Sequence, residues 1–432
     1  MNKHICIKEH QFIVNNKSIA VNNSEVASLC DKDFKELDKF ILKNSKDNEY
    51  DQIFKKIYKK PYKEVIKAQN YVGIIQLSSG TIIEILPKIY EEGGEEISRK
   101  ILLDMLKEVW KVSFKQGGNA KLNWAKINLY DIFIFIFLNE INTLLTKGLK
   151  SSYIESENNS KSFKGKLLVN EHIKNNIIHK ERFYVRYDEY SRDRVENRII
   201  KSTLVYLNKI TKNKIIKLET KKIIDELDDI KESSCIDIDL KKCLLSRDMK
   251  EYKSIIKWCK MFLKGNSFIS KKGEDETKSI LFDMNKLFEK YITTKVMKSP
   301  YFKDFDIKPQ YSNKYLIEGP NKENKLIPDI YLKKENEIFI MDIKWKVINY
   351  KESILLNISQ SDLYQLYAYA KKYDSKRVFL IYPCVGDNVE NRIYEFEQNV
   401  ELSVVFINLN NVNKGINSIA TTIDNSNLEK KF

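Results

Sequence analysis

The sequence predicts a multidomain α/β protein, and three observations support this prediction. The chain has 432 residues, more than one compact core usually holds. Of these residues, 42% are hydrophobic, enough to fill several cores. Toward the C-terminus, β-branched apolar runs alternate with stretches of helical spacing, which is typical of an α/β domain with a mixed sheet. We expect a β-rich and helical N-terminal domain at 1–150, a mainly helical region at 151–270 and an α/β domain at 271–432.

The N-terminal region contains one clear hairpin pattern. Residues 71–86 form two β-branched runs around a Ser-Ser-Gly turn, and Gly80 can adopt the positive φ that a short hairpin loop requires. Pro87 is expected to end the second strand. Apolar residues at helical spacing then predict helices at 96–115 and 128–149.

The middle region is expected to begin after a polar, serine-rich segment at 151–161, which we interpret as a domain boundary. The aromatic run at 182–187 precedes a stretch with helical spacing from about 197 to 263. A second boundary is expected at Gly265 and 271–275, where charged residues and glycine replace the apolar pattern.

The last region alternates strands and helices. Helices are expected at 281–297 and 363–373, and strands near 327–332, 338–346, 377–382 and 402–409.

The charge and the cysteines restrict the class of protein. A formal net charge of +15 favours a polyanionic partner such as nucleic acid, because neutralised phosphates release counterions. Enrichment in Lys, Asn and Ile from an AT-rich genome explains the same charge equally well. The six cysteines are scattered without a Cys-x-x-Cys pair, which predicts neither a disulfide framework nor a structural zinc site and favours the cytoplasm.

The sequence does not predict a membrane protein. The N-terminus lacks an apolar stretch of signal-peptide length. The most apolar run, 132–138, is shorter than the roughly 20 residues that span a bilayer, so we expect it to be a buried helix segment.

Two acidic residues and a lysine are the strongest candidates for a site. Asp342 and Lys344 lie two positions apart in an apolar strand and hence on one face, and the polar segment 333–337 can turn the chain so that Asp329 meets Asp342. Paired carboxylates suit Mg²⁺ or Mn²⁺, and the lysine can orient water or stabilise developing charge on a phosphate. The alternative is a turn cap at Asp329 and a solvated strand face at Asp342 and Lys344.

Pro-Asp followed by Asp-x-Lys resembles the signature of the PD-(D/E)xK nuclease superfamily. The resemblance implies a restriction-endonuclease-like C-terminal domain in which Asp329, Asp342 and Glu289 bind the metal. The resemblance also makes Lys344 catalytic together with these acids. Gln365 is expected to be catalytic as well, because it begins a Gln-x-x-x-Tyr motif like that of RecB-like members. Tyr369 and Lys346 are expected to contact DNA. For Glu289, a solvent-facing helical glutamate is an equally good interpretation.

Further blocks resemble the McrC family, the nuclease subunits of McrBC-type restriction systems that act on 5-methylcytosine DNA. They occur in family order at 71–88, 182–201, 285–291 and 362–369. The resemblance implies a McrB-like AAA+ GTPase hexamer as partner and modified double-stranded DNA as substrate. GTP would act only through the partner, and the chain has no phosphate-loop sequence of its own.

In that family the N-terminal half inserts into the partner ring and stimulates hydrolysis. The 71–88 hairpin can belong to that insertion or to the core of an ordinary adaptor domain. Five basic residues can track DNA phosphates, bind the partner or form surface salt bridges: Arg182, Arg186, Arg192, Arg194 and Arg198.

The sequence therefore favours a metal-dependent DNA endonuclease subunit that cuts only when assembled with its motor. Two alternatives remain open at this point. One is a non-catalytic regulatory or adaptor subunit of an AAA+ complex, and the other is a self-sufficient RecB-like DNA repair nuclease.

Overall fold

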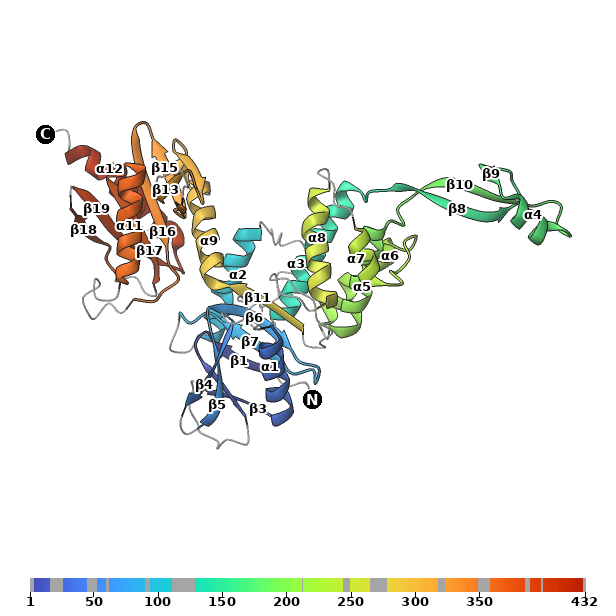
Figure 1. The fold of residues 1–432 in the computed structure, drawn as a ribbon, viewed down its shortest axis with the longest axis horizontal. Coiled ribbons are helices and arrows are strands. Elements are labelled where there is room, and N and C mark those ends of the chain that lie inside the picture. Colours follow the sequence, from blue (N-terminus) through green and yellow to red (C-terminus); the bar gives the residue numbers. More distant parts are fainter. Residues whose placement is uncertain are drawn as a thin grey trace. The chain divides into compact units, whose positions relative to one another are not determined.

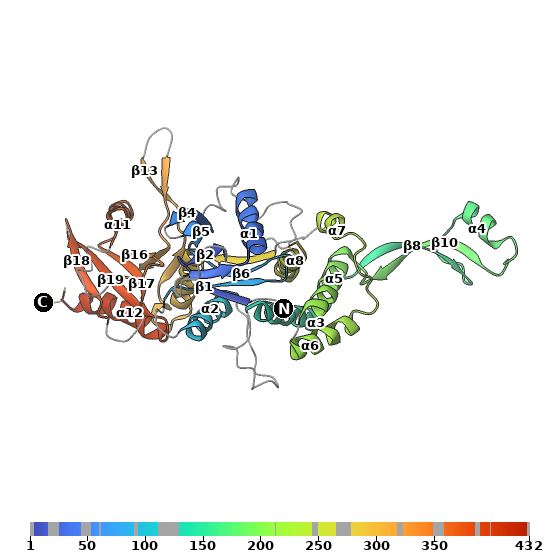
Figure 2. The same cartoon turned by 90° about the horizontal axis from the view of Figure 1, so that it is seen from below.

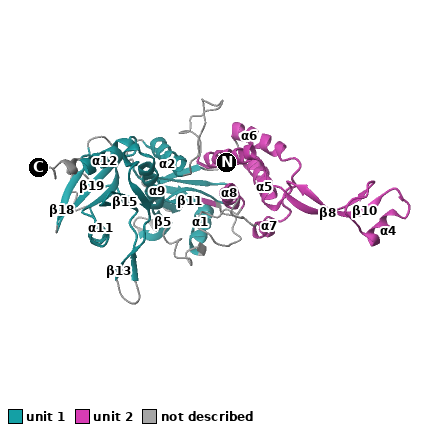
Figure 3. Cartoon of the chain, turned by 90° about the horizontal axis from the view of Figure 1, so that it is seen from above, with its two compact units in different colours: residues 1–126, 281–432 teal, residues 127–280 magenta. Residues whose placement is uncertain are grey.

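The computed structural model describes most of the chain in thirteen stretches. These are residues 4–15, 26–44, 53–59, 62–89, 94–110, 129–211, 213–243, 249–264, 278–317, 323–348, 358–384, 389–397 and 399–429. The chain packs as two compact units, one formed by 1–126 with 281–432 (unit 1) and one by 127–280 (unit 2) (Figure 3). The three-part division expected from the sequence stays a prediction.

The N-terminal part of unit 1 contains two small sheets. One has the strand order β1-β7-β6-β11 and the other β3-β2-β5-β4. Their elements and the neighbouring helices are β1 (His4–Lys8), β2 (Phe12–Asn15), β3 (Val26–Leu29), α1 (Asp31–Asn44), β4 (Phe54–Lys59), β5 (Tyr62–Ala68), β6 (Tyr71–Gln76), β7 (Ile82–Leu86), α2 (Glu95–Trp110) and β11 (Lys278–Asp283).

The hairpin predicted at 71–86 is confirmed. β6 and β7 pair antiparallel, and Gly80 in the turn between them has φ 82°, a conformation that glycine adopts without steric cost. β7 also pairs in parallel with β1, and nearly all residues of both hairpin strands are buried. The hairpin is thus a core element, as one of the two interpretations proposed. The helix expected at 96–115 begins at Glu95, and its predicted end at 111–115 lies outside the described residues.

A six-stranded mixed sheet forms the C-terminal part of unit 1, with the order β12-β15-β16-β17-β19-β18 (Figure 1). β16, β17 and β19 are parallel neighbours, whereas the outer strands pair antiparallel. This confirms the predicted mixed sheet. The elements of this C-terminal part are η3 (Pro300–Phe302), β12 (Asp306–Pro309), β13 (Lys314–Ile317), β14 (Glu323–Leu326), β15 (Ile330–Lys334), β16 (Glu337–Ile343), α11 (Gln360–Tyr373), β17 (Arg377–Cys384), β18 (Arg392–Phe396), β19 (Val400–Asn408) and α12 (Val412–Glu429).

Helix α9 (Met284–Lys298) leads from β11 into this sheet region. The side chain of Asp283 caps it by accepting from the N–H groups of Asn285 and Lys286, which satisfies donors left unpaired in a first helical turn. The helix predicted at 281–297 therefore starts three residues late, because 281–283 belong to β11. Glu108 of α2 pairs with Lys295 and Lys298 of α9, at 2.9 Å and 2.5 Å.

Unit 2 consists of helices and one projecting β hairpin. The hairpin, which we call the arm, is the antiparallel pair β8 and β10 with the short strand β9 and helix α4 (Figure 1). The elements are α3 (Leu129–Lys147), β8 (Ser152–Ser160), β9 (Lys166–Leu167), α4 (Val169–Asn176), β10 (Phe183–Ser191), α5 (Val195–Ile210), α6 (Lys214–Glu226), α7 (Ile236–Lys242) and α8 (Lys250–Lys264).

Two expectations for this region need comment. The segment 151–161, interpreted as a boundary, contains strand β8 and lies inside unit 2, and the domain boundary itself stays a prediction. The boundary expected at Gly265 and 271–275 lies outside the described residues. Helices α5, α6, α7 and α8 confirm the helical stretch expected from about 197 to 263.

Helix α3 is the one helix in the described part of the chain that is long and apolar enough to cross a bilayer by length and composition. Its apolar residues pack inside unit 2, among them Ile132, Phe133 and Phe137, each fully buried. The run 132–138 thus forms the buried helix segment that the sequence predicts.

Candidate active site

The β15–β16 hairpin brings the two aspartates together. Ile330 pairs with Met341 in the antiparallel register, so Asp329, one residue before β15, comes opposite Asp342 in β16. A two-residue turn joins the strands, and Glu335 in that turn has φ 54°. Oδ2 of Asp329 accepts a 2.7 Å hydrogen bond from the N–H of Ile343, which fixes this carboxylate against the neighbouring strand.

Lys344 follows directly after β16. Its backbone N–H donates to the carbonyl of Ile381 in β17 at 2.9 Å, so the residue continues the sheet pairing. Its ammonium lies 2.8 Å from Oδ2 of Asp342. This confirms that Asp342 and Lys344 share one face, as the spacing predicts.

The alternative of a solvated strand face is wrong for Asp342, because only 2% of this residue is exposed. Burying a carboxylate is costly unless its charge is compensated or used. The neighbours Met341 and Ile343 are buried as well, so β16 is covered on both sides.

Gln365 and Tyr369 of α11 support the lysine. Nζ of Lys344 donates to Oε1 of Gln365 at 3.4 Å, and Nε2 of Gln365 donates to the Tyr369 hydroxyl at 2.7 Å. That hydroxyl donates to the carbonyl of Ile327 at 3.0 Å. Gln365 is therefore at the site. Tyr369 is buried, and its observed role is to hold Gln365, while its contact with DNA stays a prediction.

Glu289 reaches the same cluster from α9. Gln310 links Glu289 to Asp329. Its Nε2 lies 2.6 Å from Oε1 of Glu289 and 3.1 Å from Oδ1 of Asp329. Sequence reasoning missed Gln310, which follows β12 with φ 49°. No motif marks it, and its role depends on the edge pairing of β12 with β15.

Burial and mutual repulsion control the charge states here. Burial raises the pKa of Asp329 to about 7, with further contributions from the charges of Asp342 and Glu289. Burial also raises the pKa of Asp342 and that of Glu289. For Lys344, burial acts to lower the pKa, but the charge and hydrogen bond of Asp342 together with the charges of Asp329 and Asp362 outweigh it, and the net pKa is raised. Crowded acids beside a protonated lysine are typical of a functional site.

The donor set fits a divalent metal. Oδ2 of the buried Asp342 has Lys344 as its ion-pair partner but accepts no well-directed hydrogen bond in the described part of the chain. Among the described residues, no three His, Cys, Asp or Glu side chains form a complete metal cage. Mg²⁺ is commonly bound by one or two carboxylates with waters and substrate phosphate completing its shell, and Asp329 with Asp342 supplies such a pair.

Trp345 ties the site to the N-terminal sheets of unit 1. Its Nε1 donates to Oε2 of Glu9 at 3.0 Å, and its ring lies 5.1 Å from that of Phe288, next to Glu289 in α9. Glu9 is buried, and burial raises its pKa to about 7. The segment after β16 that carries Lys344 is thus held against the N-terminal region, and Phe288 of α9 packs against the same tryptophan. Lys346, in contrast, is exposed.

The fold and the site together define a class: a mixed α/β protein with two opposed carboxylates and a lysine at the centre of a six-stranded sheet. The family model of the McrBC 5-methylcytosine restriction system component matches residues 66–383. The chain belongs to this family, which confirms the McrC-type resemblance of its sequence blocks.

Two solved structures are similar to this chain. A chain of the refined half-complex from the tetradecameric assembly of Thermococcus gammatolerans McrB AAA+ hexamers with bound McrC has a TM-score of 0.68 and 19% identity, covering 96% of this chain and 100% of that chain. A chain of the Thermococcus gammatolerans McrBC complex has a TM-score of 0.47 and 20% identity, covering 68% and 88%. No curated protein matches this chain. The first likeness shows a shared fold.

Proposed function

We propose that this chain is the DNA endonuclease subunit of a McrBC-type restriction system, with a PD-(D/E)xK nuclease domain at its C-terminus. The observation that carries the proposal is the opposition of Asp329 and Asp342 with Lys344 held 2.8 Å from Asp342. A buried carboxylate at Asp342 beside a second acid and a cation has no evident structural purpose in a strand, since apolar side chains would be more stable there.

Asp329 and Asp342 would hold Mg²⁺ or Mn²⁺. Glu289 would join them, because Gln310 links it to Asp329 by hydrogen bonds. A bound divalent ion supplies Lewis-acid polarisation of the scissile phosphate. Lys344 is protonated at neutral pH because its pKa is raised, so it acts as a hydrogen-bond donor that orients water or stabilises developing negative charge. Gln365 holds the ammonium in place, and Tyr369 holds Gln365.

The partner in this proposal is a McrB-like AAA+ GTPase hexamer in the cytoplasm, which the chain would stimulate and which would bring modified double-stranded DNA to the site. Family membership and the bound state of McrC in the Thermococcus half-complex support it. The buried 71–88 hairpin offers little surface for insertion into a ring. The end of the arm offers more, because it carries exposed apolar side chains: Phe163, Val169, Ile173, Ile177 and Ile178.

The test uses this chain reconstituted with the McrB-like protein of the same genome, GTP, Mg²⁺ and methylated DNA. Asp342→Ala and Lys344→Ala should each abolish cleavage, at least about 10³-fold in rate or about 4 kcal/mol in transition-state free energy. Both variants should stimulate the GTPase as wild type does. Ile178→Ser with Ile177→Ser at the end of the arm should instead lower GTPase stimulation.

Each other outcome points to a different function. Full cleavage by Asp342→Ala would exclude this site. A wild-type complex that hydrolyses GTP but cuts no DNA with Mg²⁺ or Mn²⁺ would indicate a regulatory adaptor subunit. Strong metal-dependent cutting by the isolated chain would indicate a self-sufficient repair nuclease.

A further inference from the structure

A two-stranded β ribbon leaves the six-stranded sheet directly at the candidate active site. It consists of β13 and β14, which pair antiparallel with each other and with no other strand in the described part of the chain. Figure 2 shows β13 projecting from the sheet of unit 1. The chain enters the ribbon after Gln310 and returns from it at Asp329, and the N–H of Gln310 donates to the carbonyl of Asp329 at 3.0 Å. The segments that lead into and out of the ribbon are therefore anchored at site residues.

The base of the ribbon is held firmly by α11. The Tyr373 hydroxyl lies 3.0 Å and 2.9 Å from the carbonyl oxygens of Tyr311 and Leu326. The Tyr369 hydroxyl donates to the carbonyl of Ile327, and the ring of Tyr311 lies 4.7 Å from that of Tyr331 in β15. The position of the ribbon is thus fixed relative to the acids and to Lys344.

The two strands themselves are exposed. Leu316 and Ile317 are 46% and 51% exposed, although an isolated two-stranded hairpin is only marginally stable in water. Lys314 pairs with Leu326, and Tyr315 pairs with Lys325, so the two lysines point to opposite faces of the ribbon. Each face of the ribbon therefore carries an exposed apolar side chain and a lysine. A polyanion that surrounds the ribbon can contact a cation on either face.

We propose that the β13–β14 ribbon lies in a groove of the double-stranded DNA substrate next to the scissile phosphate. This inference rests on the proposed nuclease function, since DNA is taken as the partner because the ribbon adjoins the proposed nuclease site. A major groove about 12 Å wide admits a two-stranded ribbon, and strands of four residues span roughly 13 Å. Leu316 and Lys314 face one wall of the groove, Ile317 and Lys325 face the other, and each lysine contacts the phosphates of its wall.

The experiment measures DNA binding and cleavage by the reconstituted complex. Lys314→Ala with Lys325→Ala should raise the KM for DNA about 10-fold with little change in kcat, because these residues contact only DNA outside the reacting bond. The slope of log affinity against log salt should fall by about 2, one for each lost phosphate contact. Leu316→Ser with Ile317→Ser should also raise KM, with an unchanged salt slope.

Matched controls lie on other surfaces of the same domain. Ile393→Ser changes another exposed apolar residue, on β18, the strand at the opposite edge of the sheet, and Lys414→Ala removes an exposed cation from α12. Neither should change KM. A benzophenone amino acid in place of Leu316 should crosslink to DNA. Crosslinking to the AAA+ partner, or ribbon variants that match the controls, would overturn the proposal.

The Asp342→Ala complex separates the two proposals. If it still cuts DNA, the nuclease site is wrongly assigned. If it is inactive but binds DNA independently of the ribbon residues, only the ribbon proposal fails.

Discussion

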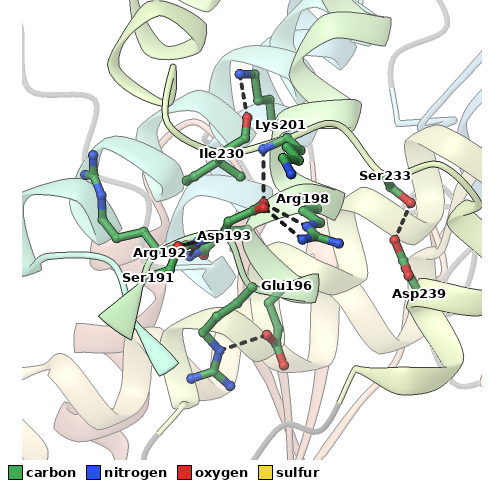
Figure 4. Close-up of polar contacts among 12 residues, drawn as sticks. Ser191, Arg192, Asp193, Glu196, Arg198, Lys201, Ile230, Ser233 and Asp239 are labelled. Atoms are coloured by element: carbon green, nitrogen blue, oxygen red, sulfur yellow. Dashed lines mark hydrogen bonds and ion pairs between the residues drawn. The ribbon is translucent and has the colours of Figure 1, made fainter. Parts of the chain in front are cut away.

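The base of the arm and the candidate active site both gather carboxylates and cations, and the two clusters differ in how their charges are matched. At the base of the arm, Arg198 donates two 2.7 Å hydrogen bonds to the two oxygens of Asp193, and the N–H of Lys231 adds a third at 3.0 Å (Figure 4). Burial acts to raise the pKa of Asp193, but the bonds from Arg198 and Lys231 outweigh it, and the pKa lies below its usual value.

In the candidate active site, three acids share one lysine. Burial, together with the charges of Asp342 and Glu289, raises the pKa of Asp329 to about 7. Matched charges stabilise a fold, whereas crowded acids are destabilising until a cation or substrate arrives. The comparison also bears on the three interpretations of the five arginines between 182 and 198. Four of the five bond acids of unit 2 at 3.2 Å or less, so most of that charge is engaged within the chain.

The largest predicted effect concerns the crowded acids of the candidate active site, and it is the dependence on pH of the free energy of unfolding that Asp329 causes. A carboxyl with a raised pKa stabilises the fold when protonated, so that this contribution is full below about pH 4 and is lost as pH rises through about 7. Across that window the loss is up to about 4 kcal/mol for a shift of this size. Metal-free unfolding of wild type and Asp329→Asn, measured from pH 5 to 8, should show the variant gaining relative stability as pH rises.

Magnesium provides the control for this prediction. Protons compete with metal for the same carboxylates, so Mg²⁺ should stabilise the wild type much more at pH 8 than at pH 5 and should have little effect on Asp329→Asn. A stability difference between the two proteins that does not change with pH would show that the acids are not crowded in solution.

The second prediction concerns the matched cluster. Asp193→Ala leaves Arg198 and the Lys231 N–H without their acceptor and should destabilise unit 2 by about 2 kcal/mol, the usual range for hydrogen bonds to charged groups. Asp193→Asn keeps one acceptor oxygen and should lose less. Hydrogen exchange of α5 amides reports the loss locally. Unchanged exchange in Asp193→Ala would mean that the cluster does not hold the arm to the helices.

The sequence predicted those parts of the site that depend on local patterns. Asp329, Asp342 and Lys344 are brought together by one hairpin, whose register follows from strand alternation and a polar turn. Gln365 and Tyr369 lie one helical turn apart on α11, and their shared face is equally local. The mixed sheet could be expected for the same reason.

Non-local contacts could not be predicted in this way. The bridge from Gln310 to Glu289 joins two segments through edge pairing and helix packing, and Glu9 meets Trp345 across 336 positions of sequence. Strand β8 of the arm was not predicted. Polar residues lie on both of its faces, so its sequence lacks the alternation of apolar and polar residues that marks a strand.

The smallest predicted effect concerns a second, more exposed ion pair at the base of the arm. Arg192 and Asp229 form two hydrogen bonds, of 2.9 Å and 2.7 Å, much like the pair of Arg198 and Asp193. Their side chains are 43% and 46% exposed, however, and exposed pairs contribute at most about 0.5 kcal/mol after solvent screening. A double-mutant cycle with Arg192→Ala and Asp229→Ala should give a coupling below that of the Asp193 pair and should lose it in 0.5 M salt, since salt screens exposed charges more strongly than buried ones. An equal coupling for both pairs would show that geometry, and not burial, sets the strength of these contacts.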